Sequence, residues 1–152
     1  MQDVLRSKHA VLEQKFQEFQ EALVGLSLHE ALVALGHWHE LLAAHVAWEE
    51  AGLLAAYVHL VPQPPRGGAH TIFFDEHQKL LRLADEMLAR LSHILEGEAD
   101  IRKTATLELL ERTFKLKGVS EHHHQREEQL MIPALSEVMA ADELAQLLEG
   151  PS

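Results

Sequence analysis

Residues 121–133 have the sequence EHHHQREEQLMIP, and the pattern of this stretch governs our interpretation of the whole chain. Within it, His123 and Glu127 are four residues apart, which places them one turn apart on the same face of an α-helix. An imidazole and a carboxylate in this arrangement can bind the same metal ion. The same spacing occurs once more at His45 and Glu49, and a second glutamate directly follows the first in both places.

Elsewhere the chain shows the three- and four-residue spacing of apolar side chains that is typical of amphipathic helices. This spacing predicts four long helices, over about residues 5–23, 28–56, 71–96 and 101–134, and a short C-terminal helix over about 142–149. Between the second and third helices, residues 61–68 (VPQPPRGG) predict the longest loop.

Three residue types predict where these helices begin and end. Gly25 is expected to end the first helix. Ser27 and Glu30 have the spacing of a capping box that opens the second helix. Pro133 is expected to kink or end the fourth helix, because its ring clashes with the preceding turn.

The two halves of the chain repeat each other. A shift of 68 residues places His9 on His77, and a shift of 78 places residues 45–50 on residues 123–128. Each half therefore predicts a helix with one inward-facing histidine, followed by a helix with an inward-facing His-x-x-x-Glu pair. Two such hairpins predict an all-α, up-down-up-down four-helix bundle with a short C-terminal helix.

Composition narrows the class of protein. The 152 residues, 47% hydrophobic and 24% charged, predict a single domain over 1–152, with the bundle over about 3–138. A formal charge of −11 argues against nucleic acid or an anionic membrane as partner. The chain has no Cys, which excludes disulfides and thiolate zinc sites. We find neither a signal sequence nor an apolar run of membrane-spanning length, so we expect a cytoplasmic protein.

A bundle of this kind would bring four imidazoles and two carboxylates together in an apolar interior. Burying an unpaired carboxylate costs on the order of several kcal/mol of folding free energy, and a pair of bound metal ions would offset this cost. With two bridging carboxylates, each metal would receive two nitrogen and two oxygen ligands. This set favours a non-haem di-iron centre with an oxo or hydroxo bridge, although zinc or manganese can be loaded in place of iron.

Simpler interpretations apply to the individual residues. A lone inward histidine is usually a core residue, and a lone His-x-x-x-Glu pair is usually an ion pair on a helix surface. The joint pattern, two copies on apolar faces and each preceded by an inward histidine, favours metal. A ferritin-like site would require Glu-x-x-His on two helices, and only Glu121 and His124 have that spacing.

The histidine run leaves a choice of ligand. His124 can pair with Glu128 in the same way as His123 pairs with Glu127. However, Lys117 lies on the same side as His124, so we expect that side to face solvent and His123 to be the ligand.

Aromatic residues lie close to the ligands in the sequence. Phe73 and Phe74 are expected to shield the metals from water. Tyr57, eight residues beyond Glu49, is in a position to approach the site, although packing is its simpler role.

The order His, His-x-x-x-Glu, His, His-x-x-x-Glu resembles the hemerythrin-like family, also called the HHE cation-binding domain, over about residues 1–140. The resemblance implies a four-helix bundle around a carboxylate- and oxo-bridged di-iron site. It also implies terminal ligands at His9, His45, His77 and His123, and bridging ligands at Glu49 and Glu127.

The sequence departs from oxygen-carrying hemerythrins at two positions. Phe73 stands where those proteins have a fifth histidine, and Glu127 lies four residues after the histidine, where they have an aspartate at five. The pattern is similar to a bacterial subgroup with a more symmetric ligand set. Two irons with open positions favour attack by peroxide or another small oxidant over reversible oxygen carriage.

These features predict a non-haem di-iron protein that binds or reacts with dioxygen, peroxide or nitric oxide. If it is an enzyme, we expect an oxidoreductase of the catalase or peroxidase type, with no catalytic residues separate from the metal ligands. The alternative is an iron- or oxygen-sensing, or iron-handling, regulatory module without turnover.

Overall fold

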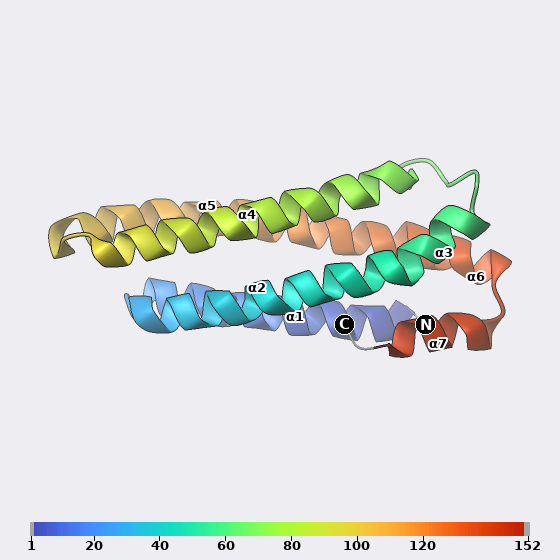
Figure 1. Cartoon of the computed structure of the whole chain (residues 1–152), viewed down its shortest axis with the longest axis horizontal. Helices are drawn as coiled ribbons and strands as arrows, with labels where there is room; N and C mark the ends of the chain where they lie inside the picture. Colours follow the sequence, from blue (N-terminus) through green and yellow to red (C-terminus); the bar gives the residue numbers. More distant parts are fainter. Residues whose placement is uncertain (1, 151–152) are drawn as a thin grey trace.

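The computed structural model describes residues 2–150, which contain helices and no strand. Four long helices run up, down, up and down in two hairpins, and a short helix folds back beside the first of them (Figure 1). The elements are α1 (Gln2–Val24), α2 (Leu28–Ala51), α3 (Leu53–Leu60), α4 (His70–Glu96), α5 (Ala99–Arg126), the π-helix η1 (Glu127–Met131), α6 (Ile132–Val138) and α7 (Ala141–Glu149). The predicted all-α bundle is confirmed.

A polar layer divides the interior into two apolar clusters. The larger cluster lies between the four long helices, and the smaller one lies under α3, α6 and α7. The helices α1 and α4 each contribute to both clusters, one on either side of the histidine: Leu5 and Leu12 flank His9, as Phe73 and Leu80 flank His77. Because the flanking residues are almost fully buried, they fix the depth at which each imidazole enters the bundle.

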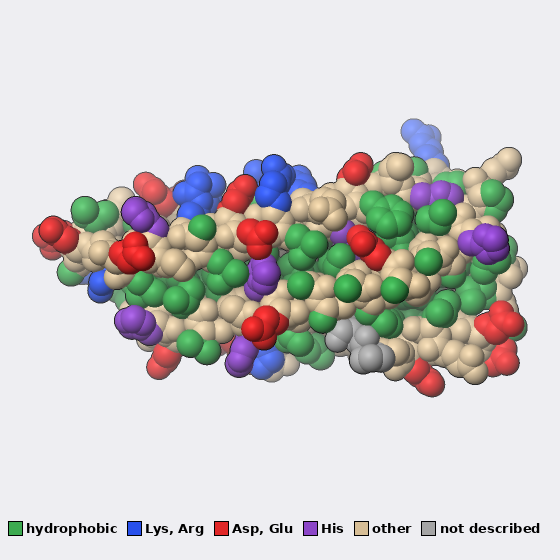
Figure 2. All heavy atoms as spheres, in the orientation of Figure 1, with side chains coloured by type: hydrophobic (Ala, Val, Ile, Leu, Met, Phe, Trp, Pro, Cys, Tyr) green, Lys and Arg blue, Asp and Glu red, His purple; other side chains and the backbone are tan. Residues whose placement is uncertain are grey.

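The outer surface differs between the two hairpins. In the face shown in Figure 2, apolar side chains run along the seam between the two hairpins. Lys and Arg side chains gather along the upper edge, over the hairpin of α4 and α5.

The α-helix is interrupted close to both His-x-x-x-Glu-Glu motifs, after the first motif and from Glu127 within the second. In the first half, α2 ends at Ala51 and Gly52 adopts φ −114° and ψ −85° before α3 begins. In the second half, η1 follows Arg126, and Ile132 donates its N–H to the carbonyl of Glu127, five residues earlier. This wider π-helical turn lies directly before Pro133. The helix therefore does not end at the proline, and it continues as α6 to Val138.

The first helix ends and the second begins where the sequence predicts, but the contacts that cap them differ from expectation. The Ser27 side chain makes no capping hydrogen bond, so the capping box predicted with Glu30 is not formed. The first helix ends at Val24, next to the expected Gly25, but the left-handed residue of the turn is Leu26, with φ 57°. Backbone bonds replace the cap there, because Gly25 donates to Glu21 and Leu26 to Leu23.

The stretch Leu28–Leu60 passes a test for membrane spans by length and composition alone, contrary to our expectation from the sequence. Its best 18-residue window has a mean hydropathy of 1.2, and 39% of that window is buried in the bundle. A core helix passes the same test, and this stretch carries His45 and Glu49 into the polar layer.

Candidate metal centre

The six predicted ligands converge in the polar layer from α1, α2, α4, α5 and η1, and each is at most 3% exposed. Their side chains form two groups in which the candidate ligand atoms all lie within 4.8 Å of one another. One group is His9, His45, Glu49 and Glu127, and the other is Glu49, His77, His123 and Glu127. The two glutamates belong to both groups, as bridging carboxylates would.

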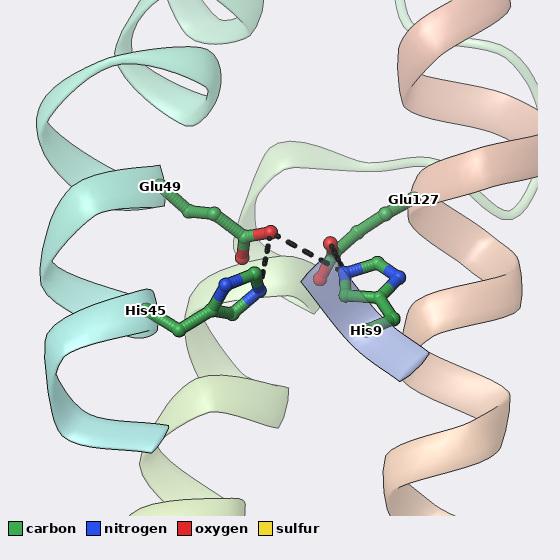
Figure 3. A group of neighbouring side chains, drawn as sticks. All are labelled: His9, His45, Glu49 and Glu127. Carbon is green, nitrogen blue, oxygen red and sulfur yellow. Dashed lines mark ion pairs between the residues drawn. The ribbon is translucent and has the colours of Figure 1, made fainter. Parts of the chain in front are cut away.

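In the first group, the two imidazoles approach the carboxylates through Nε2 (Figure 3). His45 Nε2 lies 2.9 Å from Glu49 Oε1, and His9 Nε2 lies 3.2 Å from Glu127 Oε2 and 3.6 Å from Glu49 Oε1. The four side chains therefore point at one location from three directions.

The second group has the same arrangement on the other side of the glutamates. His77 Nε2 lies 3.1 Å from Glu49 Oε2 and 3.8 Å from Glu127 Oε1, and His123 Nε2 pairs with Glu127 Oε1. Glu49 thus turns one oxygen towards each group. The internal repeat in the sequence is reproduced as an approximate two-fold relation between the groups.

The second glutamate of each motif contacts a histidine of the other hairpin. His9 Nδ1 lies 3.0 Å from Glu128 Oε1, and His77 Nδ1 lies 2.9 Å from Glu50 Oε1. An Nδ1–H that donates to a carboxylate fixes the tautomer, so that Nε2 presents its lone pair to the centre. In the sequence, Glu50 and Glu128 are marked by the Glu-Glu pair that occurs in both motifs. From the sequence we had assigned no role to the second glutamate of each pair.

The remaining two imidazoles differ in their support. His123 Nδ1 lies 3.5 Å from Glu76 Oε1, and Arg126 donates from Nε to the same oxygen at 2.9 Å. Arg126 also donates to the carbonyl of Gly67 at 2.6 Å, which ties this network to the loop before α4. Neither His45 Nδ1 nor His123 Nδ1 has a hydrogen-bond partner among the described residues, but His45 Nδ1 also has no carboxylate at ion-pair distance there.

Burial by itself would lower the pKa of the imidazoles, because a charged ring loses its hydration. The carboxylates outweigh this effect: Glu127 and Glu49 raise the pKa of His9 and of His77 to about 10, and Glu127 raises that of His123 to about 9. Burial would also raise the pKa of Glu49 and Glu127, but the imidazoles hold both below their ordinary value. Protons on the imidazoles thus balance the carboxylates where a metal cation would otherwise do so.

The residues present fit a pair of metal ions. Several of their buried polar atoms lack a hydrogen-bond partner in residues 2–150, among them His9 Nε2, Glu49 Oε1 and both oxygens of Glu127. Unpaired buried donors and acceptors are costly and rare, and here they point at one another. Neutral imidazole with carboxylate oxygen suits iron, and also zinc or manganese.

The expectation that His124 faces solvent was wrong. This side chain is 3% exposed, and its ring stacks on His9 with centroids 3.8 Å apart. Its Nδ1 lies 3.6 Å from Glu13, and burial lowers its pKa. It belongs to neither ligand group, so it packs against a candidate ligand without joining the set.

The aromatic neighbours divide into two kinds. Phe73 is buried and lies edge-on to His123 at 6.4 Å between centroids, which agrees with a shielding role. Phe74 is 36% exposed, so the same expectation was wrong for it. The Tyr57 hydroxyl donates to the carbonyl of Gly68 at 2.6 Å, so it secures the loop instead of approaching the ligands.

Comparison with known families gives one match. The sequence pattern of the Hemerythrin HHE cation binding domain matches residues 68–150, more than half of the chain. The matched segment contains His77, His123 and Glu127, and the first half of the internal repeat precedes it. The comparison with curated proteins gave no match, and neither did the comparison with solved structures.

Proposed function

The chain belongs to the hemerythrin HHE cation-binding domain family, and from this premise we propose that it is a non-haem di-iron protein that binds or reacts with dioxygen, peroxide or nitric oxide. The observation that carries the proposal is the sharing of Glu49 and Glu127 between two groups of buried imidazoles. Two cations side by side would have both carboxylates in common, and each would keep two nitrogen ligands.

In this proposal, His9 and His45 hold one iron and His77 and His123 hold the other, with the two glutamates between them. Iron bound here would supply one-electron redox chemistry and open coordination positions for a small ligand. The protein supplies the geometry and the dry surroundings. Glu128 and Glu50 orient two of the imidazoles, and the apolar clusters on either side exclude water.

The chain lacks the fifth histidine of oxygen-carrying hemerythrins, and this difference favours reaction with the small ligand over reversible carriage of it. Phe73 occupies the position one turn before His77, and its ring cannot coordinate iron. Both irons would then keep an open position, which favours disproportionation or reduction of peroxide at the centre. We therefore place catalase-type or peroxidase-type activity ahead of oxygen carriage.

A regulatory role without turnover is the second candidate. Glu49 and Glu127 are each 1% exposed, so loss of the cations leaves two carboxylates in the interior that only protonated imidazoles can balance. Metal occupancy would then control the stability of the fold, as an iron-sensing module requires.

Metal analysis and spectroscopy test the proposal. Protein purified aerobically after expression with added iron should contain about two iron ions per chain and show oxo-to-iron charge-transfer bands. Release of dioxygen from added hydrogen peroxide would support the enzymatic role. Unfolding after chelation without any turnover would support the regulatory one. Protein that stays free of iron and colourless under these conditions would refute both.

A further inference from the structure

A groove of about 450 Å³ lies between α1, α2 and the end of α7, and it reaches one of the candidate metal ligands. Aliphatic side chains such as Val11, Leu41 and Leu148 form much of its wall, and His45 is part of the same wall. His45 is only 3% exposed, so the groove meets the edge of the buried centre.

His45 is also the candidate ligand that lacks a carboxylate at Nδ1. Its counterpart in the repeat, His123, faces Glu76. The residue that corresponds to Glu76 in the first half is Lys8, which directly precedes His9 as Glu76 precedes His77. A lysine cannot accept a hydrogen bond from an imidazole, so the approximate two-fold relation is broken on this side of the centre.

Lys8 instead forms part of the groove. Its Nζ donates to the carbonyl of Gly150 at 2.7 Å and lies 4.8 Å from the ring centroid of Trp48. These contacts hold the end of α7 against α1 and α2, where Leu148 and Glu149 border the groove. Lys8, which stands where the second half has Glu76, therefore leaves His45 without a carboxylate partner and also forms part of the groove wall beside it.

We propose that this groove is the entry and docking site for the small ligand, and that the iron held by His9 and His45 is the one that the ligand reaches. The inference rests on the proposed di-iron function. Two other hollows, one of about 120 Å³ beside Glu13 and one of about 420 Å³ beside Glu76, have none of the six candidate ligands in their walls.

The walls of the groove favour uncharged ligands. Five of its nine lining residues are aliphatic, and the ammonium of Lys8 is already held by the Gly150 carbonyl and the Trp48 ring, so the lining offers little to solvate an ion. Glu149 at its border and the net charge of −11 repel anions. Dioxygen, nitric oxide and undissociated hydrogen peroxide fit this environment better than azide or nitrite.

The route is tested by the rate at which nitric oxide binds to the reduced, iron-loaded protein. Stopped-flow absorbance measures this rate. Val11 is 50% exposed and lines the groove, so Val11→Trp should slow association by roughly tenfold or more. The matched control is Val33→Trp, because Val33 is 63% exposed on α2 and lies outside the groove wall. The control should bind nitric oxide at the wild-type rate, and iron content and unfolding temperature should stay unchanged in both.

Val4→Trp blocks the groove from another position on α1 and repeats the test independently of Val11. An association rate equal to that of the wild type in both iron-loaded groove variants would overturn the proposed route while leaving the di-iron function intact. Wild-type protein that binds no iron would overturn the proposed function itself. Iron content measured on each sample separates the two failures.

Discussion

The contact between His9 and Glu128 gives a quantitative test of how the centre is held. Glu128 Oε1 lies 3.0 Å from His9 Nδ1, and its side chain is 12% exposed. The corresponding contact of Glu50 with His77 is 2.9 Å, but the Glu50 side chain is 32% exposed. Partners of this kind typically change metal affinity by about 10- to 100-fold.

Because a charge near the protein surface is more strongly screened, the two variants should differ within that range. We expect Glu128→Ala to weaken metal binding by about 100-fold, or about 2.7 kcal/mol, and Glu50→Ala by about tenfold, or about 1.4 kcal/mol. Loss of the contact between Glu128 and Arg6, at 3.7 Å, adds little because Arg6 is 61% exposed.

Anaerobic competition for ferrous iron with a chromogenic chelator measures these affinities. Glu108→Ala, an exposed glutamate on α5, is the control and should bind iron as the wild type does. Equal affinity for Glu128→Ala and Glu108→Ala would refute the orienting role. A larger loss in Glu50→Ala than in Glu128→Ala would refute burial as the origin of the difference.

Three further predictions concern single residues and pH. His123→Ala should lower iron content sharply, while His124→Ala should keep it and lower the free energy of unfolding by roughly 1–3 kcal/mol; equal iron losses on metal analysis would contradict the choice between them. Gly118→Ala should stabilise the protein by about 1 kcal/mol, because a Cβ there meets nothing within 4 Å, whereas Gly68→Ala should destabilise it, because its Cβ would lie 2.9 Å from the Tyr57 hydroxyl; denaturant unfolding decides both signs. Three ligand imidazoles have pKa values raised to about 9 or 10, so their stabilising effect on the metal-free protein is complete below their ordinary pKa and is lost as pH rises through these values. The metal-free protein should therefore unfold at lower temperature at about pH 10 than at about pH 7, and metal binding near neutral pH should release protons; an unchanged unfolding temperature or the absence of proton release would contradict this.

The sequence alone determined the fold class and the set of converging residues. Apolar spacing over four segments requires buried stripes, and an up-down-up-down bundle with short connections covers all of them. His9 and the His45/Glu49 pair lie on those stripes, as do their counterparts in the second half, so their burial follows from helix periodicity. Helix geometry is local, and a one-dimensional pattern is sufficient to predict it.

Only the tertiary structure decided what surrounds that set. The burial of His124 depends on the ring of His9, which belongs to another helix and covers the side that we had expected to face solvent. The contacts of Glu128 and Glu50 likewise join different hairpins, so no spacing within one helix predicts them. The groove beside His45 lies where Lys8 contacts the end of α7, between residues 142 positions apart in the chain. Periodicity fixes which side of a helix is buried, but the approach of one helix to another fixes which side chains meet there.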